Sequence, residues 1–196
     1  MPNVKPLSMD EAREFEPLLA PIEAAMGFLP NSLLTMARRP EILRAFAALA
    51  GAVRKGTVSP ELKQLVAHIS STAAGCRYCQ AHTADSAARI GVPQAKLEAA
   101  WNFESDTGFE EPERAALRLA RDASVVPNAV TKAHFEDLHK YFSDDEIVEL
   151  VAVISLFGWL NRWNDTMATE LESEPLDFAS KHLASRGWQV GKHRQG

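Results

Sequence analysis

The fold is decided by residues 59–82, which read SPELKQLVAHISSTAAGCRYCQAH. A serine followed by proline and glutamate is typical of a helix N-terminus, and apolar residues then recur at helical spacing to about Ala74. Gly75 breaks this helix, and Cys76 lies at or near the start of another helix that ends at Gly91. The segment therefore predicts two helices joined by a short break beside the first cysteine.

Helical periodicity and helix-capping signals continue on both sides of this segment, and no alternating strand pattern of useful length appears. The other expected helices run from Ser8 to an interruption or end at Pro21, through Met36 after a turn at 27–31, from Pro40 to Gly56, from Pro93 to Trp101, from Pro112 to about Val126, from Thr131 to Phe142, from Ser143 past Glu170, and onward from Pro175. The longest expected loop covers 102–111. The chain is predicted to be all-α, with about eight to ten helices and no sheet.

Composition indicates a single globular domain spanning residues 1–196, of which 46% are hydrophobic. The formal net charge is −5, which argues against sequence-independent binding of nucleic acid because such binding needs a basic face. The basic residues near the end of the chain are interpreted as a solvated terminus: Lys181, Arg186, Lys192 and Arg194.

The sequence also gives expectations about location. It contains no run of 18 apolar residues, so no membrane span is expected. The first residues lack the apolar core of a signal peptide. A cytoplasmic location is therefore predicted, where thiols are normally kept reduced.

An internal repeat is suggested by residues 64–70, QLVAHIS, which match residues 149–155, ELVAVIS, at five of seven positions. The two segments are offset by 85 residues, so that Cys76 aligns with Asn161 and Cys79 with Asn164. We interpret this as a helical-hairpin duplication with copies near 60–90 and 145–175, although two amphipathic helices can also match by chance.

The two cysteines of the chain, Cys76 and Cys79, are three positions apart. This spacing favours redox chemistry or metal binding over a structural disulfide bond. A cysteine at a helix start meets free backbone N–H groups and the positive end of the helix dipole, and both favour the thiolate. Residues three apart share one helix face, so that one sulfur can attack an oxidant and the other can resolve the product as a disulfide.

Three further polar residues are candidates for this site. His82 lies one turn beyond Cys79 and is a candidate proton carrier. His68 and Gln64 share one face of the preceding helix, although a buried structural histidine explains His68 equally well.

The cysteine motif has two metal-based alternatives. Cys76, Cys79, His82 and His68 form a possible Cys2His2 zinc set, but their spacing is unlike common zinc modules. Covalent haem attachment is excluded because Gln80, not histidine, follows the second cysteine. The sequence therefore predicts no metal and no bound cofactor.

The motif GCRYCQAH at 75–82, preceded by an amphipathic helix and accompanied by NRWND at 161–165, resembles the carboxymuconolactone decarboxylase and alkylhydroperoxidase D-like superfamily, in its peroxidase-related branch. The resemblance covers about residues 25 to 175. It implies an all-helical domain with a helical-hairpin repeat. It also implies homo-oligomers, as dimers, trimers or hexamers.

The resemblance further implies roles for the site residues. Cys79 would react with the peroxide and Cys76 would then form the disulfide with it. We adopt this assignment here, although the argument from the helix start favours Cys76 as the attacking thiol. The glutamate of the family's proton relay corresponds to Gln64, which exchanges no proton at neutral pH, and its histidine corresponds to Thr83. His82 is one residue early, which rotates it by about 100° around the helix. Glu149 and Glu61 are weaker substitutes for the missing glutamate.

The expected function is that of a thiol-dependent peroxidase or disulfide oxidoreductase that reduces organic hydroperoxides in antioxidant defence and is reset by an external thiol or dithiol. The alternative is a helical scaffold or ligand-binding protein with weak or lost activity. Several aromatic side chains are candidates to line an apolar substrate pocket, although core or subunit-interface packing is the stronger interpretation: Trp101, Phe103, Phe157, Trp159 and Trp163.

Overall fold

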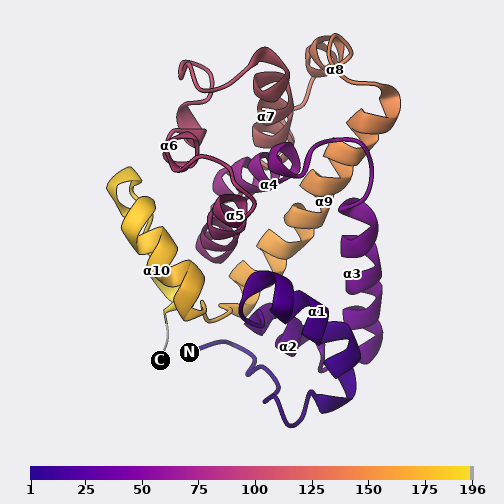
Figure 1. Ribbon diagram of the computed structural model, residues 1–196, viewed down its shortest axis with the longest axis vertical. Coiled ribbons are helices and arrows are strands. Elements are labelled where there is room, and N and C mark those ends of the chain that lie inside the picture. The colour runs from indigo at the N-terminus through magenta and orange to yellow at the C-terminus, as the bar shows by residue number, and fades with distance from the viewer. Residues whose placement is uncertain (195–196) are drawn as a thin grey trace.

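The computed structural model describes residues 1–194 and is all-helical, with no strand in that range (Figure 1). This confirms the predicted fold class. The α-helices are α1 (Glu16–Met26), α2 (Asn31–Met36), α3 (Pro40–Val53), α4 (Pro60–Ala73), α5 (Arg77–Arg89), α6 (Gln94–Glu98), α7 (Glu111–Ala123), α8 (Lys132–Leu138), α9 (Asp144–Met167) and α10 (Ser173–His182). Short 3-10 turns are η1 (Arg13–Phe15), η2 (Ala100–Asn102), η3 (Ala184–Arg186) and η4 (Gly191–His193).

Helix α4 lies at the centre of the molecule and packs against α5, α7 and α9 (Figure 1). Its apolar residues Leu65, Val66 and Ile69 are almost completely buried, because neighbouring helices cover it on several sides. The predicted break at Gly75 separates α4 from α5, and this glycine adopts a φ of +77°, which favours a residue without a side chain. Helix α10 packs against the other side of α5, next to the cysteines.

The loop between α3 and α4 is held to α9 by one carboxylate. Glu149 accepts hydrogen bonds from the backbone N–H groups of Thr57 (2.9 Å) and Val58 (3.1 Å), and it pairs with Lys63 Nζ at 2.9 Å. Gly56 has a φ of +109°, and a Cβ atom there would lie only 2.1 Å from the Glu149 side chain. Glu149 therefore has a structural role here, whereas the sequence suggested it as a substitute in a proton relay.

The structure corrects several predicted helix limits. The first helix begins at Glu16 and not near Ser8, and the helix from Thr131 ends at Leu138 and not at Phe142. Pro21 does not interrupt the first helix, since α1 runs through it. Pro21 is exposed, so water can satisfy the carbonyl group that loses its helical partner. The helix from Ser143 does not continue past Glu170, because α9 ends at Met167, where Ala168 adopts a left-handed conformation with a φ of 49°. No helix among residues 1–194 combines the length and apolar character that crossing a membrane requires.

The two segments of the suspected repeat differ in one respect. Residues 60–89 form two helices with a break at Gly75, whereas residues 149–164 form part of the continuous helix α9. Asn164 nevertheless donates a hydrogen bond to Cys79 Sγ at 3.5 Å, and these are the two residues that the repeat aligns. Such a meeting of equivalent positions is expected beside a pseudo-two-fold axis. The duplication and the single-domain boundary remain predictions.

Candidate active site

Cys76 and Cys79 are both free thiols, and both are buried, with exposed fractions of 1% and 2%. Cys76 is the N-cap residue of α5, and its sulfur accepts a hydrogen bond from the Cys79 backbone N–H at 3.4 Å. An N-cap side chain normally accepts this bond, which in most helices goes to an oxygen atom. The structure therefore places the first cysteine at the helix start, as the sequence predicted.

The surroundings of the two thiols push their pKa values in opposite directions. Hydrogen bonds from the Cys79 thiol and backbone N–H lower the pKa of Cys76, despite the opposing effect of burial. Burial raises the pKa of Cys79 well above its usual range, and the neighbouring Cys76 raises it further. Cys76 is consequently the more acidic thiol, and thiolate rather than thiol is the nucleophile.

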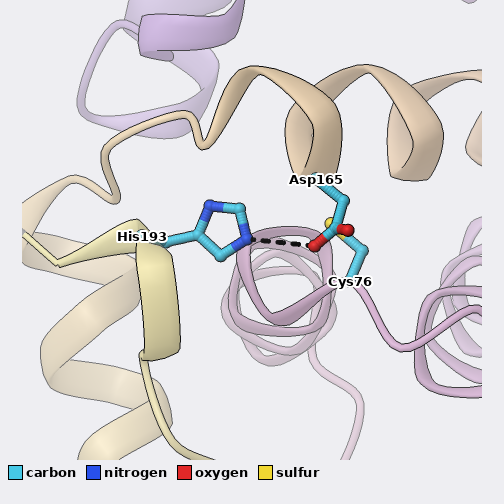
Figure 2. A group of neighbouring side chains, drawn as sticks. All are labelled: Cys76, Asp165 and His193. Carbon is cyan, nitrogen blue, oxygen red and sulfur yellow. Dashed lines mark ion pairs between the residues drawn. The ribbon is translucent and has the colours of Figure 1, made fainter. Parts of the chain in front are cut away.

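Beside Cys76 lie two residues that the sequence analysis did not place there, Asp165 from the end of α9 and His193 from η4 (Figure 2). One ligand atom from each of these three residues lies within 4.8 Å of the other two. His193 Nε2 is 3.6 Å from Asp165 Oδ1, and Lys192 Nζ pairs with Asp165 Oδ2 at 2.8 Å. Burial lowers the pKa of His193. The carboxylate thus bridges the C-terminal segment to the first cysteine.

These contacts correct one sequence-based interpretation, that of the basic residues near the end of the chain. The basic tail is not wholly solvated, since His193 is only 1% exposed. No sequence pattern indicates that His193 is buried, because a histidine in a polar terminus has no periodic apolar pattern around it.

His82 lies in a buried polar network whose described hydrogen bonds do not include the sulfurs. Its Nε2 atom is 2.6 Å from Glu172 Oε2, and Tyr78 donates its hydroxyl hydrogen to Glu172 Oε1 at 2.9 Å. Asn31 N also donates to this carboxylate. Burial alone would raise the pKa of Glu172, but His82 and the hydrogen bonds lower it overall. The His82 ring stacks on Tyr78 with centroids 4.2 Å apart, so these residues form a packed unit around Glu172, which the sequence analysis missed.

The His68 side chain is linked to the backbone of Cys79 through the side chain of Thr83. Its Nδ1 atom is 3.0 Å from Thr83 Oγ1, and Thr83 donates to the Cys79 carbonyl oxygen at 2.7 Å. Because the threonine hydrogen is used in that bond, Nδ1 of His68 acts as the donor to Thr83. Burial lowers the pKa of His68 to about 4, so the ring is neutral at physiological pH. Gln64 is partly buried one turn earlier on α4, and the described contacts do not join it to the cysteines.

A surface pocket of about 420 Å³ opens beside the start of α5. Its lining includes the residues on either side of the cysteines and two tryptophans, namely His68, Gly75, Arg77, Gln80, Trp101 and Trp188. Neither cysteine lines it. Trp188 donates its indole N–H to the Arg77 carbonyl oxygen at 3.1 Å and packs in the same apolar cluster as both thiols. Trp188 therefore contacts both the pocket and the apolar cluster that contains the sulfurs.

Of the aromatic residues considered for such a pocket, Trp101 lines it and is 52% exposed. Phe103 is fully buried in the core. Trp159 and Trp163 stack on each other with centroids 5.0 Å apart, and Trp159 also stacks on Phe46 of α3. Most of this aromatic set therefore serves packing.

Comparison with known proteins places the chain in a family. The sequence profile of the Carboxymuconolactone decarboxylase family matches residues 40–122. The debrominase Bmp8 has 37% sequence identity, and its structure superposes with a TM-score of 0.85 over 91% of this chain and 96% of that chain. The chain belongs to the carboxymuconolactone decarboxylase family, as the cysteine motif indicated, and this family includes enzymes such as the debrominase.

Further similar proteins include a second Bmp8 structure and two more distant relatives. A second Bmp8 structure, of a variant with a cysteine replaced by alanine and in complex with 2,3,4-tribromopyrrole, has a TM-score of 0.86. An uncharacterized peroxidase-related protein from Ralstonia eutropha is 24% identical over 89% of this chain and 94% of that chain, with a TM-score of 0.77, and supports the fold alone. The protein YnjA of Escherichia coli is 28% identical over 58% of this chain, and the match spans 63% of its own length.

Proposed function

We propose that the protein is a dithiol-dependent reductase in which Cys76 attacks an electrophilic substrate and Cys79 then closes a disulfide. The observation that carries this proposal is the placement of two free thiols at the start of α5, with the Cys79 N–H directed at the Cys76 sulfur. A helix N-terminus stabilises a thiolate, and a neighbouring thiol is the usual means of resolving the product.

For an organic hydroperoxide, the Cys76 thiolate attacks the terminal oxygen, the O–O bond breaks, and the alcohol leaves after taking up one proton. Cys76 is then a sulfenic acid, and the Cys79 sulfur displaces water from it to form the disulfide. An external thiol or dithiol returns the pair to the reduced state. This reaction fits a role in antioxidant defence in the cytoplasm, where such reductants are abundant.

A second substrate class is favoured by the similarity to Bmp8, which extends over 91% of this chain at 37% identity. Reductive dehalogenation of a brominated aromatic ring uses the same two thiols. The net reaction converts one C–Br bond and two thiols into a C–H bond, a disulfide, a bromide ion and a proton. The electron balance equals that of the peroxide reaction, so that one dithiol site can serve either substrate class.

The choice of Cys76 as the attacking thiol departs from the role that the family resemblance implies for Cys79. Hydrogen bonds lower the pKa of Cys76, whereas burial raises that of Cys79. Because only the thiolate attacks at a useful rate, the more acidic sulfur is the better nucleophile near neutral pH. Cys79, which is held against Cys76 by its own backbone, is suited to the resolving step.

The test is peptide mass spectrometry of the reduced protein after treatment with one equivalent of cumene hydroperoxide or, separately, 2,3,4-tribromopyrrole. We expect a rapid Cys76–Cys79 disulfide with at least one of them. In Cys79→Ser, the first product remains on Cys76 and is trapped as a sulfenic acid in the peroxide reaction. In Cys76→Ser, no such product forms.

The possible outcomes separate the candidate functions. A disulfide formed only with the bromopyrrole, together with released bromide, assigns dehalogenation, and one formed only with the hydroperoxide assigns peroxide reduction. Thiols that stay free with both compounds contradict the reductase and favour the scaffold alternative, in which Gln64 and Thr83 mark a lost proton relay. A product trapped on Cys79 in Cys76→Ser contradicts the assignment of the attacking thiol.

A further inference from the structure

Three potential metal-ligand atoms converge beside the start of α5 (Figure 2). They are the Cys76 sulfur, Asp165 Oδ1 and His193 Nε2, and each lies within 4.8 Å of the other two. The Asp165 and His193 atoms are 3.6 Å apart, which is longer than a hydrogen bond. Each residue comes from a different element, so that the cluster exists only in the folded chain.

The orientation of His193 is fixed by its other nitrogen. Nδ1 lies 2.7 Å from the Thr169 carbonyl oxygen, and because a carbonyl oxygen only accepts, Nδ1 carries the hydrogen atom. In the neutral ring, Nε2 then presents its lone pair to Asp165 and Cys76. This nitrogen is buried without a hydrogen-bond partner, in a side chain that is 1% exposed.

We propose that the reduced protein binds one Zn²⁺ ion through Cys76 Sγ, Asp165 and His193 Nε2. Thiolate, imidazole and carboxylate are the ligands that zinc takes in proteins, and three such ligands leave the fourth position open to water. A histidine that binds a metal generally donates its other ring N–H to a carbonyl or carboxylate, which here is Thr169. The site differs from the Cys2His2 set considered from the sequence, and it includes neither Cys79 nor His82.

The spacing and charge of the cluster suit such an ion. Ligand atoms around tetrahedral zinc are about 3.3–3.8 Å apart, given bond lengths of about 2.0–2.3 Å, and the measured separation of 3.6 Å between Asp165 and His193 falls in that range. Lys192 holds the second carboxylate oxygen at 2.8 Å, which leaves Oδ1 directed at the cluster. The lysine ammonium also repels a bound cation, so it limits the affinity.

Zinc binding has a direct consequence for the cysteine. An ion on Cys76 occupies the lone pair that would attack a substrate, and it therefore protects the thiol from oxidation and alkylation. Cys79 is not a ligand in this site, because its sulfur accepts a hydrogen bond from Asn164 instead. Zinc and electrophile would thus compete for one sulfur.

The test uses reduced, chelator-stripped full-length protein, titrated with Co²⁺ as a spectroscopic probe and then with Zn²⁺ in competition. We expect one ion per chain, a thiolate-to-cobalt absorption band, and tetrahedral visible bands that Zn²⁺ abolishes. His193→Ala and Asp165→Asn should each weaken binding by about 100-fold or more, since loss of an outer partner alone costs about 10- to 100-fold. Cys79→Ser should bind as the parent protein does.

Two controls separate ligation from loss of structure. His139→Ala removes a half-exposed histidine far from the cluster in the chain and should leave binding unchanged. Lys192→Ala should strengthen binding a few-fold, which no purely structural effect would do. The proposal is overturned if no cobalt–thiolate band appears, if Cys79→Ser removes the band, or if Asp165→Asn and His193→Ala bind like the parent. None of these readouts requires substrate turnover, so the outcome is independent of the proposed reductase activity.

Discussion

At the scale of single residues, two chemically identical thiols three positions apart acquire different properties. Cys76 caps a helix and receives hydrogen bonds, whereas Cys79 is one turn inside the helix and faces the apolar interior and Asn164. The first environment favours the thiolate and the second disfavours it. The division of labour between the two sulfurs therefore arises from their position on α5.

The His82 network allows a prediction that separates a packing role from a catalytic one. Glu172→Gln removes the charge that pairs with His82 and accepts from Tyr78 in a buried site. We expect the free energy of unfolding to fall by about 2 kcal/mol or more, with the alkylation rate of Cys76 within about twofold of the parent's, because the sulfur is not part of that network.

Urea unfolding and iodoacetamide kinetics measure the two effects. Glu174→Gln, an exposed neighbour on the same helix turn, is the matched control and should change neither. A large loss of Cys76 reactivity in Glu172→Gln, with stability intact, would show that His82 and Glu172 do act on the sulfur.

At the scale of elements, the contact between the α3–α4 loop and α9 predicts a pH dependence. Partial burial would raise the pKa of Glu149, but Lys63 and the backbone N–H groups of Thr57 and Val58 hold it at about 2, below its usual value of 4.5. A carboxylate with a depressed pKa stabilises the fold above its unfolded-state pKa, and this stabilisation is lost as the pH falls from about 4.5 towards 2.

Glu149→Gln should consequently lower the free energy of unfolding at pH 7 by about 1–3 kcal/mol, and the gap to the parent protein should narrow as the pH approaches 2. Denaturant unfolding across this pH range is the measurement. Glu136→Gln, at an exposed glutamate on α8, should follow the parent curve. A gap that is constant with pH would mean that the carboxylate charge contributes nothing.

The segment after α10 packs against the cysteines, and we expect it to control the access of reagents to the two sulfurs. Trp188 packs in the apolar cluster of both thiols and is anchored to the Arg77 carbonyl group. Trp188→Ala should open a path from the 420 Å³ pocket to the sulfurs, and alkylation of Cys76 should accelerate about tenfold.

Trp101→Ala is the control for that variant, because Trp101 lines the same pocket but is 52% exposed. It should leave the alkylation rate near that of the parent protein. Equal rates in Trp188→Ala and the parent protein would indicate that the sulfurs are reached by another route.

At the scale of the whole molecule, helices α3 and α9 pack against each other and also carry apolar side chains that are exposed to solvent. Leu49 is 54% exposed, Val148 67% and Val151 39%, and the Phe46–Trp159 stack lies on the same pair of helices. Apolar residues gathered on adjacent helices are typical of protein–protein interfaces. We infer that this surface is where copies of the chain associate, in line with the oligomer implied by the family.

Leu49→Glu should therefore shift the protein to a smaller species in size-exclusion chromatography with light scattering, because a charge would be buried at the interface. Ile90→Glu, at an exposed apolar residue just after α5, is the matched control and should leave the mass unchanged. A parent protein that is monomeric at micromolar concentration would contradict the inferred interface.

The sequence by itself determined the helical class, the break at Gly75, the position of Cys76 at a helix start, and the family. These features depend on local periodicity, on helix capping and on a short motif, all of which are written in neighbouring residues. Only the tertiary structure decided which side chains surround the sulfurs. It brought Asp165 and His193 to Cys76, placed His82 on Glu172, and left Gln64 apart, because contacts between residues far apart in the chain depend on how α5, α9 and the C-terminal segment pack.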